Sequence, residues 1–421
     1  MCIRDSNDLD QFPTNIASAD SLTDFDGVLN AAYFYQHASA TPLAVMGDFR
    51  ADNAFMDEAP FTEFDIFGPN LTAMEDQFFG PFYTGLYRSI LSANIVIENS
   101  TDATQVGEAR FLRGLSYFKL VKVFGDVVVN LSDSPSTTDQ SILERQSAMS
   151  VYTTVIIPDL EAAAAALGTE INNGRASRLA AQGMLGKVYM QMGDFGNAES
   201  ELAAVVNGAA GAGIALQSNF GEIFGVDNDL NPEIIYATQI SGSIADEYGF
   251  SEFWSWSGGL DTKSLLPLDS DLVAAFDASP GDLRRDVTIN TDVMASPKFP
   301  QTGGPEHDWI ELRLADVILL YAEALNENGN TSAALAQLNV IRSRAGLDNS
   351  TATSQGAVRQ AIADERRLEL AFEGQRWFDL VRTGTVDAEM GQTINSNFHL
   401  FPVPISEVLA SFGVITQNPG Y

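Results

Sequence analysis

Five large aromatic side chains crowd one glycine-flanked segment of this chain, IADEYGFSEFWSWSGG (Ile244–Gly259). They are Tyr248, Phe250, Phe253, Trp254 and Trp256. Sugar rings present C–H faces that stack on indole rings, and an aromatic side chain on a loop buries a large area at low entropic cost. The segment therefore indicates a carbohydrate-type ligand site, with all of these residues except Phe250 as contacts. The alternative is that both tryptophans anchor the loop to neighbouring helices.

A second stretch with polar and aromatic groups but no helical periodicity runs from Ala38 to Asn70. Its candidate ligand contacts are Asp48, Arg50, Asp52, Asn53 and Phe67. Charged and amide groups suit sugar hydroxyls, and long irregular connections in compact domains more often carry function than merely join elements. Ordinary turn formation by aspartate and asparagine is the alternative for each polar residue singly.

Recognised catalytic and metal-binding motifs are missing from the sequence. The three histidines, His37, His307 and His399, show neither the HExxH pattern nor any paired spacing, and GxSxG, P-loop and GxGxxG motifs do not occur. The run Asp227–Asp229 begins like a calcium loop but lacks the glycine and the closing glutamate of an EF-hand. We therefore expect no catalytic residue, no metal and no cofactor. Because acidic residues are abundant, a glycoside hydrolase that uses two carboxyl groups is the alternative enzyme class.

A carboxylate occurs on the apolar face of a predicted helix in AIADERRLELAFEGQRWFDLVRTG (Ala361–Gly384). The apolar residues at helical spacing are Val358, Ala361, Leu368 and Phe372. Glu365 falls on the same face, where a carboxylate is costly unless a cation pairs with it. The local candidates are Arg366, Arg367 and Arg376. Gly374 ends the helix, and a short helix follows over Gln375–Arg382. We interpret these charges as a structural ion-pair network that locks two helices together.

Helical periodicity dominates the chain outside two regions and predicts paired helices. The predicted helices are Phe12–Asn30, Phe79–Glu98, Ala103–Phe124, Glu144–Leu167, Arg178–Met192, a return helix from Phe195, Leu314–Asn326 and Ser332–Arg344. Tight turns at Gly193–Asp194 and Asn328–Asn330 give two helix–turn–helix units similar to tetratricopeptide repeats, which stack because neither helix alone can bury its apolar face. We expect about four such pairs in one curved, mainly all-α scaffold. Short β structure is expected at Val127–Asn130 and Asn231–Ser241.

The composition is that of an acidic globular protein. The chain has 421 residues, 45% hydrophobic content and a formal net charge of −33 from 56 acidic and 23 basic residues. Phosphate binding needs a basic face, so the charge argues against a nucleic-acid partner and favours neutral or cationic ligands. No window approaches the roughly 18 apolar residues of a membrane span. Cys2 is the single cysteine, so neither an internal disulfide nor a multi-cysteine metal site is possible.

Five stretches of the sequence form an ordered set. They are EARFLRGLSYFKLVKVFGDVVV (Glu108–Val129), RLAAQGMLGKVYMQMGDFGNAESEL (Arg178–Leu202), DWIELRLADVILLYAEALNENG (Asp308–Gly329), ERRLELAFEGQRWFDLVR (Glu365–Arg382) and the chain end from LFPVPISEV to ITQNPGY (Leu400–Tyr421). The amino-acid sequences of these stretches and their order along the chain resemble those of the SusD/RagB family of outer-membrane nutrient-binding lipoproteins of Bacteroidetes. The resemblance implies a single domain over residues 1–421. The helical-repeat scaffold is expected at 79–207 and 308–384, and the loop-rich, ligand-facing regions at 38–70 and 208–306.

The resemblance also implies a function. Members of this family are non-catalytic proteins that bind glycans at the cell surface and deliver them to a SusC-like TonB-dependent outer-membrane transporter. It implies an outward-facing outer-membrane lipoprotein that meets the membrane only through a lipid anchor. The start, MCIRDS, does not resemble the family and has no apolar stretch before Cys2. We therefore expect residues 1–10 to be an artefactual or truncated start, with the anchor missing from this chain. A protein-interaction scaffold built from the repeats is the other alternative.

Overall fold

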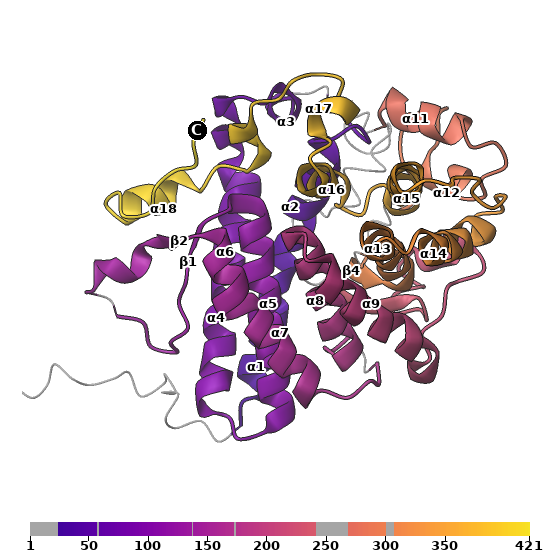
Figure 1. The fold of residues 1–421 in the computed structure, drawn as a ribbon. Helices are drawn as coiled ribbons and strands as arrows, with labels where there is room; N and C mark the ends of the chain where they lie inside the picture. Colours follow the sequence, from indigo (N-terminus) through magenta and orange to yellow (C-terminus); the bar gives the residue numbers. More distant parts are fainter. Residues whose placement is uncertain (1–23, 57–58, 137, 172–173, 241–267, 300–306) are drawn as a thin grey trace, which may run out of the picture.

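The fold consists mainly of α-helices that stack side by side roughly in chain order (Figure 1). It is seen in a computed structural model that describes residues 24–56, 59–136, 138–171, 174–240, 268–299 and 307–421. One apolar core extends through the described elements, from Phe25 near the first helix to Ile415 near the chain end. The mainly all-α architecture predicted from the sequence is confirmed.

The first layer holds the longest helices. α1 (Asp26–Tyr35), α4 (Gly80–Asn99) and α5 (Ala103–Phe124) pack against one another. Between α1 and α4 the chain forms a series of short helical pieces: η2 (Gln36–Ser39), α2 (Ala40–Ala44), the π-helical η3 (Val45–Phe49), α3 (Glu63–Ile66), η4 (Pro69–Met74) and η5 (Glu75–Phe79). These pieces bring the polar residues near position 50 into the core.

The following helices build the repeat scaffold. They are α6 (Ala148–Val151), η7 (Tyr152–Ile156), α7 (Ile157–Ala166), α8 (Arg178–Met192), α9 (Phe195–Gly208), α13 (Leu314–Glu327) and α14 (Thr331–Arg344). α5 packs on α7, α7 on α8, α8 on α9, and α9 on α13, which pairs with α14. The pairs α4–α5, α8–α9 and α13–α14 are therefore successive units of one stack, as the tetratricopeptide-like pattern predicts (Figure 1).

Close packing within a pair depends on small residues and capped helix ends. Gly186 of α8 lies so near α9 that an added Cβ would stand 2.4 Å from Cδ2 of Leu202. Ser177 caps α8, because its side chain accepts a hydrogen bond from the Ala180 amide, and Asp194 caps α9 in the same way through the Asn197 amide. The Ser177 cap accounts for the start of α8 at its predicted residue, and Asp102, which accepts from the Thr104 and Gln105 amides, does the same for α5.

The C-terminal segment returns to the first layer. α15 (Gln355–Leu370) packs on α13 and α14, and α16 (Arg376–Thr383) and α17 (Val386–Glu389) follow it. After η10 (Ser396–His399), the amide of Phe401 donates to the carbonyl of Val123 at 3.0 Å. The Asn418 side chain, beyond α18 (Ile405–Ala410), donates to the Phe124 carbonyl at 2.9 Å. The two ends of the described chain are thus joined through α5.

Two small antiparallel sheets occur among the described residues. β1 (Val127–Val128) pairs with β2 (Arg145–Gln146), and β3 (Ile234–Thr238) pairs with β4 (Trp309–Arg313), with Thr238 opposite Trp309. β3 lies inside the predicted Asn231–Ser241 strand. β4 leads directly into α13 and carries charged side chains into the core. Other short elements are η6 (Gln140–Leu143), η8 (Ala209–Ala212), η9 (Phe220–Ile223), α11 (Ser270–Asp277) and α12 (Arg285–Thr288).

Several element boundaries differ from the sequence predictions. The stretch Ala38–Asn70, predicted to be irregular, contains α2, η3, α3 and the start of η4, because its buried polar side chains supply hydrogen-bond partners that the sequence pattern does not reveal. The single helix predicted over Glu144–Leu167 is instead β2 followed by α6, η7 and α7, with Ser147 as the cap. Most of the predicted Phe12–Asn30 helix lies outside the described residues, and α1 begins at Asp26.

Candidate functional site

A buried charge cluster surrounds the C-terminal half of α15. Its carboxylates are Glu233, Glu365, Glu369 and Glu373, and its cations are Arg284, Arg313, Arg344 and Lys298. Arg313 alone reaches Glu233 at 2.9 Å, Glu369 at 2.5 Å and Glu373 at 2.7 Å. A buried ion is tolerated only when its charge and its hydrogen bonds are satisfied. The predicted structural ion-pair network exists and is larger than the sequence indicated.

The partners predicted for Glu365 were wrong. Its carboxylate pairs with Arg284 at 2.7 Å and Arg342 at 3.0 Å, and not with the three neighbouring arginines. Arg366 instead meets Asp316 and Asp379, while Arg367 and Arg376 share Asp52. On a helix, adjacent residues project in different directions, so an arginine next in sequence to Glu365 cannot reach the same face. Arg284 and Arg342 come from distant elements, which no local pattern reveals.

The helix carrying Glu365 also ends earlier than predicted. α15 stops at Leu370, and the chain turns through residues 371–375, which we call the signature turn. Phe372 and Gly374 both have left-handed backbone, with φ of 67° and 68°. A Cβ on Gly374 would stand 2.8 Å from the Leu43 carbonyl oxygen, and a Cβ on Gly47 would stand 2.3 Å from the Gly374 backbone. Two glycines therefore allow η3 and the signature turn to touch backbone to backbone.

The predicted ligand contacts near position 50 lie inside the fold. Asp48 is fully buried, and its carboxylate accepts from the amides of Phe372 at 3.2 Å and Gly374 at 2.7 Å. Burial raises the pKa of Asp48 to about 6, although these hydrogen bonds oppose the rise. Asn53 donates to the same carboxylate at 2.9 Å. In the structure these side chains hold the signature turn in place.

Arg50, Asp52 and Phe67 have internal partners as well. Arg50 is buried, donates to the Phe64 and Phe398 carbonyls at 2.9 Å each, and lies 4.5 Å from the ring centre of Phe67. Asp52 accepts two hydrogen bonds from Arg376, each of 2.7 Å. Burial alone would raise the pKa of Asp52, but Arg376 and Arg367 outweigh it and hold the pKa below its ordinary value.

The structure joins the two predicted ligand-facing regions, 38–70 and 208–306, at one point. Ala54 forms a β-bridge with Leu268, and the Asp269 amide donates to the Asn53 carbonyl at 3.1 Å. Tyr248, Phe253, Trp254 and Trp256 lie outside the described residues, in the segment that ends at this bridge. We call the bridge with the neighbouring Asp65 the junction. The bridge brings the polar stretch next to residue 268, the first described residue after the segment that carries these aromatic side chains.

The junction carries two carboxyl groups that the sequence analysis did not single out. Asp65 accepts from the Met56 amide at 3.3 Å, and burial, with Asp269 adding to it, raises the pKa of Asp65 to about 7. Burial also raises the pKa of Asp269. A carboxyl group that is protonated near neutral pH both donates and accepts hydrogen bonds, as sugar hydroxyls do. No motif marks these two residues; their proximity becomes visible only in the fold.

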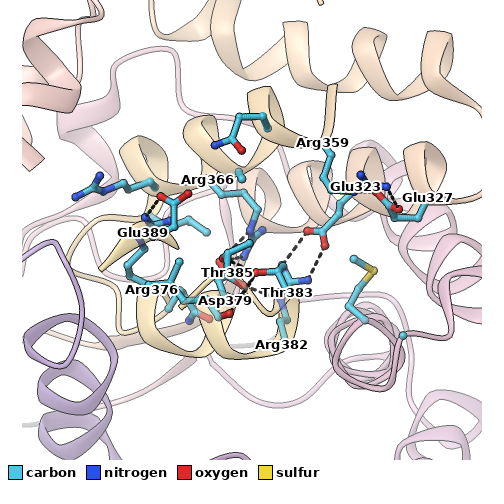
Figure 2. A pocket seen from close by; sticks show the side chains of 18 of the residues that line it. Glu323, Glu327, Arg359, Arg366, Arg376, Asp379, Arg382, Thr383, Thr385 and Glu389 are labelled. Atoms are coloured by element: carbon cyan, nitrogen blue, oxygen red, sulfur yellow. Dashed lines mark hydrogen bonds and ion pairs between the residues drawn. The ribbon is translucent and has the colours of Figure 1, made fainter. Parts of the chain in front are cut away.

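Beside the junction lies a cavity of about 290 Å³, which we call the signature pocket (Figure 2). α15 and α16 form most of its wall, which α13, α17, Asn53 and the segment around the turn between α8 and α9 complete. Its apolar lining includes Met190, Phe195, Leu370 and Leu380, and Asn53 connects it to the junction. Sequence reasoning treated the residues of this wall as purely structural, because a charged helical stripe gives no sign of an adjoining cavity.

Every carboxylate that lines the signature pocket is held by an arginine. The pairs are Glu323–Arg382, Glu327–Arg359, Asp379–Arg366, Asp379–Arg382 and Glu389–Arg376 (Figure 2). Burial alone would raise the pKa of Asp379, but Arg366 and Arg382 hold it below its ordinary value. A general acid for glycoside hydrolysis needs the opposite, a carboxyl group that stays protonated near neutral pH. The pocket lining is therefore suited to binding through fixed polar groups.

Three arginines of the pocket keep a donor free. Arg359, Arg367 and Arg376 use Nε and Nη2 in their hydrogen bonds, and their Nη1 groups have no hydrogen-bond partner among the described residues. Such donors can serve the oxygen atoms of a polar ligand. Among all the residues that the structure describes, no group of three or more acidic, histidine or cysteine side chains is arranged to hold a metal ion. In the calcium-like run Asp227–Asp229, the side chain of Asn228 donates to the Phe224 carbonyl.

Family comparisons agree with this architecture. Residues 288–421 match the family model described as the SusD family, and residues 4–190 match a second one described as starch-binding associating with outer membrane. The chain belongs to the SusD family. The two matches together span most of the sequence, including α4, α5 and the whole signature pocket wall on α15 and α16. The relationship predicted from the five ordered stretches is confirmed.

This SusD family member is similar in sequence to curated relatives and in fold to solved structures. SusD-like protein P2 of Formosa agariphila is 27% identical over 410 residues, covering 81% of this chain and 80% of the relative. A SusD-like protein of Bacteroides ovatus is 26% identical over 414 residues, covering 84% of this chain and 73% of the relative. Among solved structures, a SusD superfamily protein from Bacteroides vulgatus has a TM-score of 0.79 and 22% sequence identity, and the match covers 95% of this chain and 99% of that one. A laminarin-binding SusD-like protein has a TM-score of 0.77 and 23% identity, and the match covers 95% of this chain and 99% of that one. At these identities the structures establish the fold.

None of the helices in the described residues combines the length and the apolar character needed to cross a bilayer.

Proposed function

We propose that this SusD family member captures glycans at the outer membrane without cleaving them. The observation that carries the proposal is the match of residues 4–190 to the starch-binding, outer-membrane-associated family. Two solved structures with the same fold are described as a laminarin-binding SusD-like protein and, in Bacteroides fluxus, surface glycan-binding protein A. The arginine-paired carboxylates of the signature pocket agree with binding rather than hydrolysis.

The proposed ligand surface is centred on the junction. The aromatic residues Trp254 and Trp256 would stack on sugar rings, with Tyr248 and Phe253 beside them, and Asp65 and Asp269 would meet the hydroxyl groups. Asp48, Arg50, Asp52, Asn53 and Phe67 would act by holding the junction in shape, since their side chains have partners inside the fold.

The test is the double substitution Trp254→Ala and Trp256→Ala, measured by isothermal titration against starch, laminarin and other polysaccharides. Binding should weaken tenfold or more, because each stacked ring contributes on the order of 1 kcal/mol. Phe34→Ala is the matched control: this aromatic side chain is half exposed but lies on α1, outside the proposed surface. Thermal melts of all variants report whether each one folds.

The outcomes separate the classes of function. Binding without new reducing ends, lost in the double variant and kept in Phe34→Ala, supports capture. Release of shorter saccharides would make the protein a glycoside hydrolase. Lack of binding to any saccharide would leave a scaffold of helical repeats. An unfolded double variant would make the tryptophans core residues and would move the search to the junction carboxyl groups.

We also propose that the captured glycan passes to a SusC-like, TonB-dependent transporter, and that the full-length protein is an outward-facing lipoprotein. Support comes from the outer-membrane description of the matching family. Affinity purification of the full-length protein from membranes in mild detergent should recover the transporter encoded beside it. Recovery of the protein alone, while the transporter is present in the same membranes, would contradict the partnership.

A further inference from the structure

Behind the signature turn lies a small cavity whose wall contains three lysines. Its volume is about 20 Å³, enough for one particle of the size of water. Lys119 and Lys122 reach it from α5 and Lys187 from α8, while Glu311 of β4 and Gln375 complete the polar lining. Gln375 also lines the signature pocket, so the two cavities lie on opposite sides of one turn.

Two of these lysines have carboxylate partners. Lys119 Nζ donates to Glu311 in a short contact, to Gln36 at 3.0 Å and to Ser39 at 2.8 Å, so its three N–H groups are all used. Lys187 Nζ donates to Asp316 at 2.7 Å and to Gln375 at 3.4 Å, which leaves it one N–H group. The pairing then continues outward from Asp316 through Arg366, Asp379, Arg382 and Glu323. In each of these two sets the positive and negative charges are equal in number, so neither set has a carboxylate to spare.

Lys122 has no such partner. Its Nζ atom lies 4.2 Å from the ring centre of Phe378, and the structure gives it no carboxylate and no hydrogen-bond acceptor among the described residues. A cation over a phenylalanine ring gains about 0.5–2 kcal/mol but keeps its full charge. Burial, followed by repulsion from Lys187 and Lys119, lowers the pKa of Lys122 to about 7. When Lys122 is protonated, one positive charge at this cavity therefore has no paired carboxylate among the described residues.

We propose that the cavity binds one small monovalent anion, chloride or an ion of similar size and charge, between the ammonium groups of Lys122 and Lys187, which keep N–H groups free of acceptors among the described residues. An anion at this place neutralises the excess charge and reduces the repulsion among three neighbouring cations. The small volume excludes phosphate, sulfate and sugar carboxylates. Part of the Lys122 side chain is exposed to solvent, although its ammonium group is desolvated by its surroundings. This site does not depend on the proposed glycan function.

The first test compares thermal stability in sodium chloride and sodium gluconate at equal ionic strength. Gluconate is too large to enter the cavity, so replacing it with chloride should raise the Tm of the wild-type protein by about 2 °C. Lys122→Met keeps the aliphatic stem and should abolish the rise. Arg88→Met is the matched control, because Arg88 is an exposed arginine on α4 that rests on Tyr35 without an ion pair among the described residues.

A pH series sharpens the test. The anion needs the protonated lysine, so the apparent affinity for chloride should fall about tenfold for each pH unit above the pKa near 7. Three charged groups face Lys122 from other elements, and each already has a hydrogen-bonded partner of opposite charge. Lys187 pairs with Asp316, Glu311 with Lys119, and Asp379 with Arg366. Lys119 lies on the same helix as Lys122. A chloride effect that is independent of pH between 6 and 9 would contradict the proposal.

Bromide gives a direct readout that does not depend on a variant. Crystals of the wild-type protein soaked in sodium bromide should show an anomalous peak within the cavity, in contact with Lys122 Nζ. Absence of the peak together with equal melting temperatures in chloride and gluconate would overturn the proposal, leaving Lys122 as a neutral amine beside water. A chloride effect that persists in Lys122→Met would place the responsible ion elsewhere and would equally overturn it.

Discussion

Among single residues, the depth of burial and the nearest cation decide which carboxyl groups carry charge. Asp52 and Asp379 have arginine partners and pKa values below the ordinary range, whereas Asp65 at the junction has a pKa raised to about 7. The first two stabilise the fold through their charge. The third destabilises it when ionised, which is typical of groups kept for a purpose other than stability.

The pH dependence at Asp65 has a defined sign. Because its pKa is raised on folding, the group costs nothing below its unfolded pKa near 4 and costs progressively more as pH rises to about 7. Asp65→Asn should therefore raise Tm at pH 8 by a few degrees and leave Tm at pH 4 nearly unchanged. Differential scanning calorimetry measures both values, with Asp286→Asn, an exposed carboxylate, as the control. A lower Tm at pH 8 would contradict this assignment.

Buried and exposed ion pairs should differ sharply in their effect on stability. Arg313 is buried against Glu233, Glu369 and Glu373, so Arg313→Met leaves carboxylates short of a partner and should cost on the order of 3–5 kcal/mol. Arg359 is half exposed and pairs with Glu327 alone, so Arg359→Gln should lower the free energy of unfolding by less than about 1 kcal/mol. Urea unfolding of both variants checks the contrast. Equal losses would mean that the buried network contributes no more than a surface pair.

Among the helices and strands, the pattern of apolar residues was sufficient where a helix buries one face against its neighbour in the chain. α5 and α8 have the predicted bounds, and β3 lies within the predicted strand. The pattern failed at Ala38–Asn70, where short helical pieces are stabilised by partners more than 300 residues away, such as Phe372 for Asp48. A single sequence contains no signal for such a pairing.

The same limit applies to the candidate site. The polar residues near position 50 were predicted as ligand contacts, and the structure gives their side chains partners inside the fold. Whether each side chain points to solvent or inward depends on packing that periodicity does not encode in an irregular stretch. Asp65 was overlooked and the cavity beside α15 was not anticipated for this reason.

The contact between η3 and the signature turn gives a prediction about elements. Gly47→Ala places a Cβ 2.3 Å from the Gly374 backbone, which cannot move without displacing α16, and should cost about 3 kcal/mol or more. Gly27→Ala in α1 meets nothing within 4 Å and should be neutral or stabilise by up to about 1 kcal/mol. Chemical denaturation of the two variants tests this. A tolerated Gly47→Ala would show that the two segments can separate at little cost.

On the scale of the described molecule, buried charges of both signs compensate one another. Arg50, Arg113, Arg284, Arg313, Arg366, Arg376, Lys119 and Lys298 are all buried, in a chain with only 23 basic residues against 56 acidic ones. Thirteen acidic residues are buried as well, so the interior comes close to balancing its charges and most of the acidic excess lies outside the core. An acidic surface keeps the protein soluble and repels polyanions, which agrees with the proposed neutral glycan ligands.

The contacts of Asp48 also determine when the molecule can be completed. Its carboxylate accepts hydrogen bonds from the Phe372 and Gly374 amides, and Asp52 accepts hydrogen bonds from Arg376. The residues near position 50 therefore bind partners about 325 positions later in the chain. Contacts with such long sequence separation form late, after the entropy of loop closure has been overcome. Asp52→Asn should therefore speed unfolding while leaving the refolding rate nearly unchanged, as stopped-flow fluorescence can measure. A chain whose last fifty residues have not yet been synthesised lacks Phe372, Gly374 and Arg376, so the ribosome must finish almost the whole protein before Asp48 and Asp52 can meet their partners.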